Sequence, residues 1–162
     1  MARGRRGARR RFSSGTWRLS IRHAREAKQA RTTHPNTDAR ARALTATRGA
    51  LDKKALEPAL LDVRNATSYT DYILLLSGRS DRQVQAVADG VLEAMQDEGC
   101  KPLGVEGDSQ GHWVLLDFGD VVVHVFYHPL REFYDLEGLW LDAPRVPLEV
   151  PPDAHISAES RY

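Results

Sequence analysis

The chain of 162 residues contains one cysteine, Cys100, and no long apolar run. A single cysteine excludes an intramolecular disulfide and fits a reducing compartment best. No segment approaches the roughly 18 to 20 consecutive apolar residues that a membrane helix needs, so no membrane association is expected. The N-terminus also lacks the apolar middle region of a secretory signal. The length of 162 residues favours one folded domain with extensions, and these absences argue against a secreted or membrane protein.

Acidic residues are scarce in the first part of the chain. Residues 1–48 contain 14 Lys and Arg against 2 acids, a net charge of +12, whereas residues 49–162 contain 9 bases and 20 acids, a net charge of −11. Residues 1–38 have too few large apolar side chains for a core and are predicted to be a basic, disordered extension. Three interpretations stay open: an arm that binds nucleic acid through phosphates, a leader without function or upstream of the true start, and a mitochondrial or plastid transit peptide.

Regular structure is predicted to begin at Asp38, a plausible N-cap for a helix over residues 39–56. Pro58 is expected to end that helix. The apolar run over residues 59–66 then predicts a buried strand, and residues 72–76 predict a second one.

The clearest local signal is a helix that starts after Ser80. Ser80 and Gln83 have the spacing of a capping box, and Asp81 adds negative charge at the positive end of the helix dipole. Apolar residues then recur at spacings of three and four as far as Met95, and Gly99 is placed to end the helix. One face of this helix is therefore expected to pack on a sheet.

The segment from Gly111 to Phe126, GHWVLLDFGDVVVHVF, predicts a hairpin. Its strands cover residues 112–117 and 121–127, with a turn over residues 118–120. The runs of Val and Leu lack alternation, so both faces of these strands should be covered. A last helix is predicted over residues 130–139. The element order gives an α/β fold of the mixed-sheet (α+β) kind, a layered domain over residues 39–146 with four or five strands and flanking helices, followed by a disordered tail over residues 147–162.

Catalytic patterns are weak. Asp62, Asp71 and Asp81 lie near strand ends, but no pair of carboxylates has the spacing that metal-dependent phosphoryl transfer uses. The loop over residues 77–81 precedes a helix N-terminus and lacks the glycines and lysine of a P-loop. No enzymatic activity and no cofactor are therefore expected.

The histidines do not indicate a metal site. His112, His124 and His128 lie on or beside the hairpin, but their spacing matches no zinc pattern, and no nucleophile elbow accompanies them. His124 is interpreted as a hydrogen-bonded interior residue.

Several motifs resemble the ribosomal silencing factor family, also called Iojap, over residues 51–146. They are S-x-T-D-Y from Ser68, G-x-S-x-R-x-V as read from Gly78 to Val84, P-L-G-V-E-G from Pro102, and the hairpin motif from Trp113 to Phe126, with L-W at residues 139–140. One departure is Gln83, where the family usually has His. The resemblance implies a fold similar to that of nucleotidyltransferases, without the paired acidic catalytic motif.

The resemblance also implies a function. Members of this family bind the large ribosomal subunit through the universal large-subunit protein number fourteen, sterically block joining of the small subunit and so repress translation, while organellar relatives act in large-subunit assembly. A body with a net charge of −11 would be repelled by bare ribosomal RNA, so little direct nucleic-acid binding by the domain is expected, and docking on a basic protein is the sensible route. The family implies a bacterial cytoplasmic location, or an organelle if the N-terminus is a transit peptide.

The resemblance places the docking patch at the hairpin. Its residues are expected to be Trp113, Asp117, Phe118 and Asp120, with Trp113 as an aromatic anchor and the two acids ready to pair with a partner's Lys or Arg. Phe118 is expected to be exposed at the turn. An exposed apolar hairpin end would also allow two copies to form a homodimer when the ribosome is absent.

Two other functions remain open. One is a nucleotide-binding enzyme of the nucleotidyltransferase type, with Asp62, Asp71 and the loop over residues 77–81 around the nucleotide. The other is an RNA-binding module that acts through the arginine-rich arm.

Overall fold

The computed structural model describes residues 38–156 of the chain. The expectations for residues 1–37 therefore lie outside the described residues, as do those for the last six. The elements in chain order are α2 (Ala39–Asp52), β1 (Leu56–Asp62), β2 (Tyr72–Gly78), α3 (Asp81–Asp97), β3 (Gly104–Gly107), β4 (Trp113–Asp117), β5 (Val121–Tyr127), α4 (His128–Tyr134), a 3-10 helix η1 (Leu136–Trp140), β6 (Arg145–Val146) and a second 3-10 helix η2 (Pro152–Ala154).

The strands form one mixed sheet in the order β3-β4-β5-β2-β1-β6. The central strands β2 and β5 pair in parallel, and the other neighbours pair antiparallel. The α/β class with a mixed sheet is therefore confirmed, with six strands where the sequence predicted four or five. The additional strands are β3 and the short edge strand β6. The two glycines of β3 made this stretch look like a loop in the sequence.

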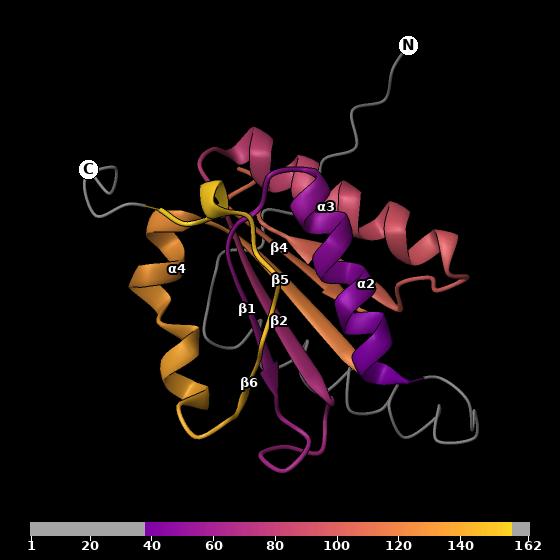
Figure 1. Cartoon of the computed structure of the whole chain (residues 1–162). Coiled ribbons are helices and arrows are strands. Elements are labelled where there is room, and N and C mark those ends of the chain that lie inside the picture. The colour runs from indigo at the N-terminus through magenta and orange to yellow at the C-terminus, as the bar shows by residue number, and fades with distance from the viewer. Residues whose placement is uncertain (1–37, 157–162) are drawn as a thin grey trace.

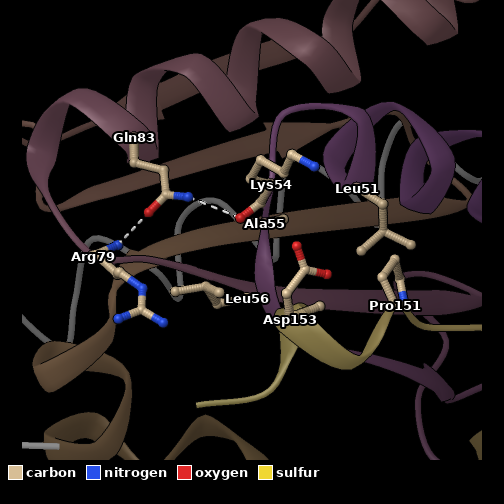
Figure 2. A pocket seen from close by; sticks show the side chains of 9 residues that line it. Leu51, Lys54, Ala55, Leu56, Arg79, Gln83, Pro151 and Asp153 are labelled. Atoms are coloured by element: carbon tan, nitrogen blue, oxygen red, sulfur yellow. Dashed lines mark hydrogen bonds between the residues drawn. The ribbon is translucent and has the colours of Figure 1, made fainter. Parts of the chain in front are cut away.

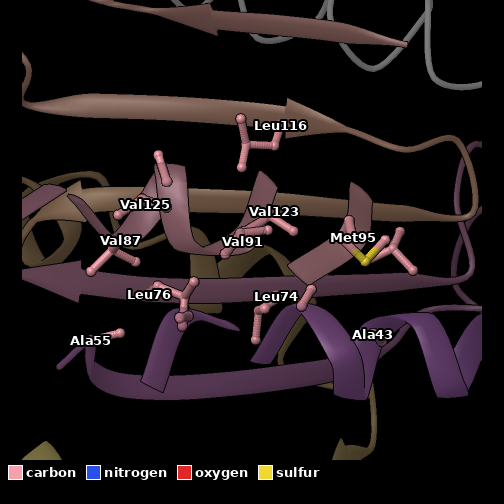
Figure 3. Packing of buried hydrophobic residues seen from close by; sticks show 14 of the residues in the cluster. Ala43, Ala55, Leu74, Leu76, Val87, Val91, Met95, Leu116, Val123 and Val125 are labelled. Atoms are coloured by element: carbon pink, nitrogen blue, oxygen red, sulfur yellow. The ribbon is translucent and has the colours of Figure 1, made fainter. Parts of the chain in front are cut away.

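Both faces of the sheet carry apolar side chains, because successive residues of a strand point to opposite faces. Leu74, Leu76, Val123 and Val125 belong to a core that α2 and α3 cover (Figure 3). Their neighbours in the strands belong to a second core on the other face, against which residues of η1 pack. Figure 1 shows α2 and α3 side by side and α4 apart from both. The prediction that both faces of the hairpin strands are covered is confirmed.

Helices α2 and α3 make close contact at two glycines. A Cβ atom built on Gly49 would lie 2.5 Å from the carbonyl oxygen of Gly90 and 2.6 Å from Cβ of Ala94. A Cβ atom on Gly90 would lie 2.6 Å from the carbonyl oxygen of Gly49. Because Cβ atoms are not found so close to other atoms, glycine at residue 49 permits this helix spacing.

The helix caps agree with the sequence in most details. Asp38 caps α2 by accepting a hydrogen bond from the Arg40 amide, and Ser80 Oγ accepts one from the Gln83 amide at 3.1 Å. The capping box differs in its second half, because Gln83 Oε1 accepts from the Arg79 amide at 2.7 Å. Gly99, with φ +75°, follows the end of α3 as predicted.

The region around Pro58 differs from the prediction. Helix α2 ends at Asp52, and Pro58 lies inside β1, where the register with β2 is irregular between Leu56 and Ala59. Glu57 has a φ of +46° at this irregularity. A proline is tolerated there because a bulge needs no ladder hydrogen bond from its amide. The strand therefore runs from Leu56 to Asp62 rather than over residues 59–66.

The last helix is broken where the sequence predicted it to be continuous over residues 130–139. Asp135 has a φ of +42°, so α4 ends at Tyr134 and the chain continues as η1. The Asp135 side chain accepts a hydrogen bond from the Gly138 amide, which stabilises this start of η1.

The tail also differs from the prediction of disorder, as far as residue 156. Ala154 and Ile156 are 5% and 8% exposed, and the Ile156 amide donates to Glu57 Oε1 at 2.6 Å. The segment over residues 147–156 therefore packs back onto the bulge of β1.

Candidate functional site

The hairpin of β4 and β5 is built around a three-residue turn. The Phe118 amide donates to the carbonyl oxygen of Val121 at 2.9 Å, and Gly119 has a φ of +87°. Glycine is favoured there because side chains are strained at such angles. The Gly119 amide donates to Asp117 Oδ1 at 2.8 Å, so this carboxylate holds the turn. The predicted hairpin and its turn are confirmed.

Three rings stack in a row on the second face of the hairpin. Trp113 stacks on His124 with ring centroids 6.3 Å apart, and His124 stacks on Phe126 at 5.8 Å. The Trp113 indole Nε1 donates to His124 Nδ1 at 3.3 Å. An Nδ1 that accepts a hydrogen bond requires the neutral tautomer with its proton on Nε2. Burial lowers the pKa of His124 to about 4, which also favours the neutral ring at pH 7. His124 is a hydrogen-bonded interior residue, as predicted.

The four residues predicted to dock a partner lie close together in the chain but are less accessible than expected. Trp113, Asp117 and Phe118 are 3%, 5% and 1% exposed. Phe118 belongs to the core under α2 and α3, so the expectation of an exposed phenylalanine is wrong. The burial has a physical reason: the turn directs this ring under the helices rather than outward. The apolar hairpin end that was to support a homodimer is therefore not exposed.

Asp120, the fourth residue of the predicted patch, contacts α2 and the residues at the start of β2, which the sequence did not predict. Its Oδ2 lies 2.8 Å from Nη2 of Arg42 on α2, and the two side chains are 16% and 14% exposed. Its carbonyl oxygen accepts from the amides of Asp71 and Tyr72. Asp120 therefore joins the hairpin turn to α2 and to the start of β2. Whether the four residues bind a partner stays a prediction.

The residues proposed for a nucleotide do not converge. In the antiparallel pair of β1 and β2, Asp62 is opposite Tyr72, whereas Leu56 is opposite Ser77. Asp62 and Asp71 therefore lie at one end of these strands, and the loop over residues 77–81 lies at the other, about 17 Å away at some 3.4 Å per residue. The hydrogen bond from Arg64 lowers the pKa of Asp62, so that carboxylate is engaged. The residues suggested for a nucleotide site therefore do not lie together in the structure.

A cavity of about 200 Å³ lies beside that loop (Figure 2). Gln83 closes one wall, because its Nε2 donates to the carbonyl oxygen of Lys54 at 2.8 Å while its Oε1 accepts from the Arg79 amide. Leu56 and Ala154 contribute apolar surface. The C-terminal segment thus forms part of a cavity that the sequence did not indicate.

The sequence reasoning missed a buried polar cluster around Arg131. The Arg131 side chain is 6% exposed; Nη1 donates to the carbonyl oxygen of Glu57 at 2.5 Å and to Ser77 Oγ at 3.0 Å, and Nε donates to Glu137 at 2.9 Å. His128 Nδ1 lies 2.9 Å from the same Ser77 Oγ. Burial raises the pKa of Glu137, but the charges and hydrogen bonds of Arg131 and Arg145 together outweigh burial, and the pKa is lowered. No sequence pattern distinguishes this arginine from a solvated one.

Between residues 38 and 156, no group of three or more His, Cys, Asp or Glu side chains is arranged to hold a metal ion. Within the same residues, no helix has the length and apolar character to cross a membrane.

Comparison with known proteins gives relatives of one kind. A ribosomal silencing factor of Halalkalibacterium halodurans is 44% identical over 98 residues, which are 60% of this chain and 84% of that protein. The mouse protein named mitochondrial assembly of ribosomal large subunit protein 1 is 30% identical over 91 residues, 54% of this chain and 40% of its own length.

A solved structure supports the same relationship. A crystal structure of a Chromobacterium violaceum protein superposes with a TM-score of 0.63 at 33% identity, covering 71% of this chain and 95% of that one. The family model described as "Ribosomal silencing factor during starvation" matches residues 36–161, well over half of the sequence. This match includes the hairpin, the capped helix α3 and the segment that packs back onto β1. The chain therefore belongs to the ribosomal silencing factor family.

Proposed function

We propose that this protein is a ribosomal silencing factor that binds the large ribosomal subunit, sterically blocks joining of the small subunit and so represses translation. The observation that carries the proposal is the family match over residues 36–161. The partner on the subunit is the universal large-subunit protein number fourteen. The proposed location is the bacterial cytoplasm, where the subunits join, or an organelle if the N-terminal residues are a transit peptide.

The charge of the domain supports docking on a protein. Residues 38–156 contain 11 bases and 20 acids, a net charge of −9, which opposes close approach to RNA phosphates and favours a basic protein surface. The proposed contact is the hairpin, with Asp117, Phe118 and Asp120 at its turn and Trp113 at the other end of β4. Three of these are buried, and Asp120, 16% exposed and paired with Arg42, is the least buried of the four. Phe118 packs under α2 and α3 beside the turn, whereas Trp113 packs in the core of the other face, at the opposite end of β4.

The proposed activity is steric and needs neither a catalytic group nor a cofactor. The separation of Asp62 and Asp71 from the loop over residues 77–81 supports this reading over a nucleotidyltransferase. A role in large-subunit assembly is the second candidate, favoured by the name of the mouse relative.

The test is sedimentation of the purified protein with separated ribosomal subunits, followed by addition of small subunits. The proposal predicts cosedimentation with large subunits and fewer joined ribosomes. If the protein remains at the top of the gradient with both subunits, the proposal is wrong. Normal joining of subunits that carry the protein would favour the assembly role.

Matched variants locate the contact. Asp120→Asn removes the carboxylate charge, whereas Arg42→Gln breaks the same ion pair from the other side and leaves the carboxylate in place. Docking through Asp120 predicts that only Asp120→Asn weakens binding, by about tenfold, as for the loss of one charge-assisted contact. Trp113→Ala is expected to cost about 2 kcal/mol of binding free energy if Trp113 is an anchor, provided that thermal unfolding shows a folded variant. Equal affinity for a folded Trp113→Ala variant would refute its part in docking.

A further inference from the structure

The segment from α4 to Leu141 exposes an unusual amount of apolar surface. Seven large hydrophobic side chains are exposed in the described part of the chain, and four of them lie within nine residues. Phe133 and Leu141 are 78% and 83% exposed, Leu139 is 54% exposed and Tyr134 is 40% exposed. We call these four residues, with the exposed acids Glu132, Asp135 and Asp142, the α4–η1 surface. Clustered exposed apolar residues with a polar rim are typical of interaction sites.

This exposure follows from the break at Asp135. The chain turns there, and Leu136 and Trp140 of η1 pack on the second core, where Trp140 contacts Tyr69 with ring centroids 5.9 Å apart. Because those two side chains point to the sheet, the apolar residues between and beside them remain at the surface. Phe133 and Tyr134 stack edge to face with centroids 5.2 Å apart.

Buried hydrogen bonds attach the α4–η1 surface to the sheet. Arg131 of α4 donates to the carbonyl oxygen of Glu57 in β1, to Ser77 in β2 and to Glu137 in η1. Arg145 of β6 also bonds Glu137. A surface fixed by such a buried network loses little conformational entropy when a partner binds. Exposed apolar residues on a flexible loop would lose more conformational entropy on binding than the residues of the α4–η1 surface.

The charge around the surface selects the partner. Residues 129–144 contain four acids and one base, a net charge of −3. The one base is Arg131, which is buried against Glu137, so the exposed charges of the segment are those of Glu132, Asp135 and Asp142. Nucleic acid and anionic membranes would be repelled. A second copy in a two-fold contact would bring the same acids together, because an isologous interface pairs a patch with itself.

We propose that the α4–η1 surface is a docking site for a basic amphipathic segment of another protein, with apolar side chains on Phe133, Leu139 and Leu141 and flanking Lys or Arg beside the acids. In such binding of an amphipathic segment, apolar anchor residues provide affinity and flanking charges provide orientation. The site does not depend on docking at the hairpin. Asp120 of the hairpin turn precedes β5 and α4 follows β5, so the turn and the α4–η1 surface lie at opposite ends of that strand and can be occupied together.

The experiment is a fluorescence anisotropy titration of the full chain with a labelled amphipathic peptide of Leu and Lys. The expected result is saturable binding that Phe133→Ser with Leu141→Ser weakens at least tenfold, and that Glu132→Gln with Asp142→Asn weakens severalfold and makes less dependent on salt. The control replaces an exposed leucine and an exposed acid elsewhere, Leu44→Ser with Glu93→Gln, and should leave the affinity within about twofold.

Three results would overturn the proposal. The first is equal weakening by the control pair, which would mean attraction to the acidic domain as a whole. The second is equal binding of a peptide with Ser in place of Leu, which would mean that the apolar residues are not used. The third is a dimer in analytical ultracentrifugation that Phe133→Ser with Leu141→Ser converts to monomer, which would make a second copy the occupant. All substituted residues are exposed, so the variants should remain folded, as circular dichroism would check.

Discussion

Arg42 of α2 and Asp120 of the hairpin turn form an ion pair with a nitrogen–oxygen distance of 2.8 Å, in a region where both side chains are largely buried. The pair joins the first helix to the turn that the sequence marked as a docking element. The Asp120 carboxylate therefore contributes to the contact between the turn and α2 whether or not a partner is bound.

A double-mutant cycle should show that this pair is coupled. Arg42→Ala, Asp120→Ala and the double variant are expected to give a coupling free energy of about 1–2 kcal/mol in urea unfolding, because partial burial reduces screening. Arg48 and Glu98, 3.8 Å apart and more than half exposed, are the control pair. Their coupling should stay below about 0.5 kcal/mol, and similar coupling for the two pairs would contradict the argument from burial.

The stability of the domain should fall in mild acid because of His124. Its pKa of about 4 in the folded protein lies below the 6.5 of an unfolded histidine, so the unfolded chain binds the extra proton between these values. The contribution is fully present above pH 6.5 and is lost as the pH falls toward 4. Between pH 7.5 and about pH 5 the expected loss is about 2 kcal/mol in the free energy of unfolding.

His124→Gln is the matched control, because a glutamine oxygen can accept the Trp113 indole proton without titrating. Its free energy of unfolding should change less over the same pH range. If the free energy of unfolding of His124→Gln varied with pH as in the unsubstituted protein, groups other than His124 would cause the loss of stability in acid.

Arg131→Lys should destabilise the domain strongly. A lysine cannot bond Glu57, Ser77 and Glu137 at once, and Glu137 would be left half-buried with a weaker partner. Removal of one partner from such a buried cluster costs about 3–5 kcal/mol. Arg145→Lys, at an arginine 63% exposed beside the same Glu137, should cost less than about 1 kcal/mol, as chemical denaturation would measure.

Gly49→Ala should destabilise the domain although alanine favours helices. Helix propensity alone would stabilise α2 by about 1 kcal/mol. The new methyl group would lie 2.5 Å from the Gly90 carbonyl oxygen, a backbone atom that moves only with α3. Overpacking of this kind costs about 1–3 kcal/mol, so urea unfolding should show a net loss. A more stable variant would show that the helices separate easily.

The parts of the fold that sequence reasoning predicted were those with local chemical signals. Helix α3 has a cap at Ser80 and a continuous apolar stripe, and both act within a few residues. Strand β3 has no such signal, because two of its four residues are Gly104 and Gly107 and it is a strand only through pairing with β4. The break at Asp135 depends on an aspartate in a left-handed conformation, which few sequences reveal.

The hairpin was predicted in position, but the exposure of its residues was not. The hairpin, its turn and the interior His124 follow from apolar runs and turn residues. The burial of Phe118 depends on where α2 lies, and the position of α2 depends on contacts such as Gly49 with Gly90 that join distant parts of the chain. The same holds for Arg131, whose partners are 74 and 54 residues away in Glu57 and Ser77.

The parallel pairing of β2 with β5 has a consequence for synthesis of the protein. Strand β2 is complete at Gly78, but its central neighbour is not complete until Tyr127 has been added. Until then a nascent chain holds a strand with one open edge whose residues are all buried in the finished fold, and such edges promote aggregation. The domain is therefore expected to fold late and as one unit, and products truncated before Tyr127 should be removed by proteases or chaperones rather than accumulate.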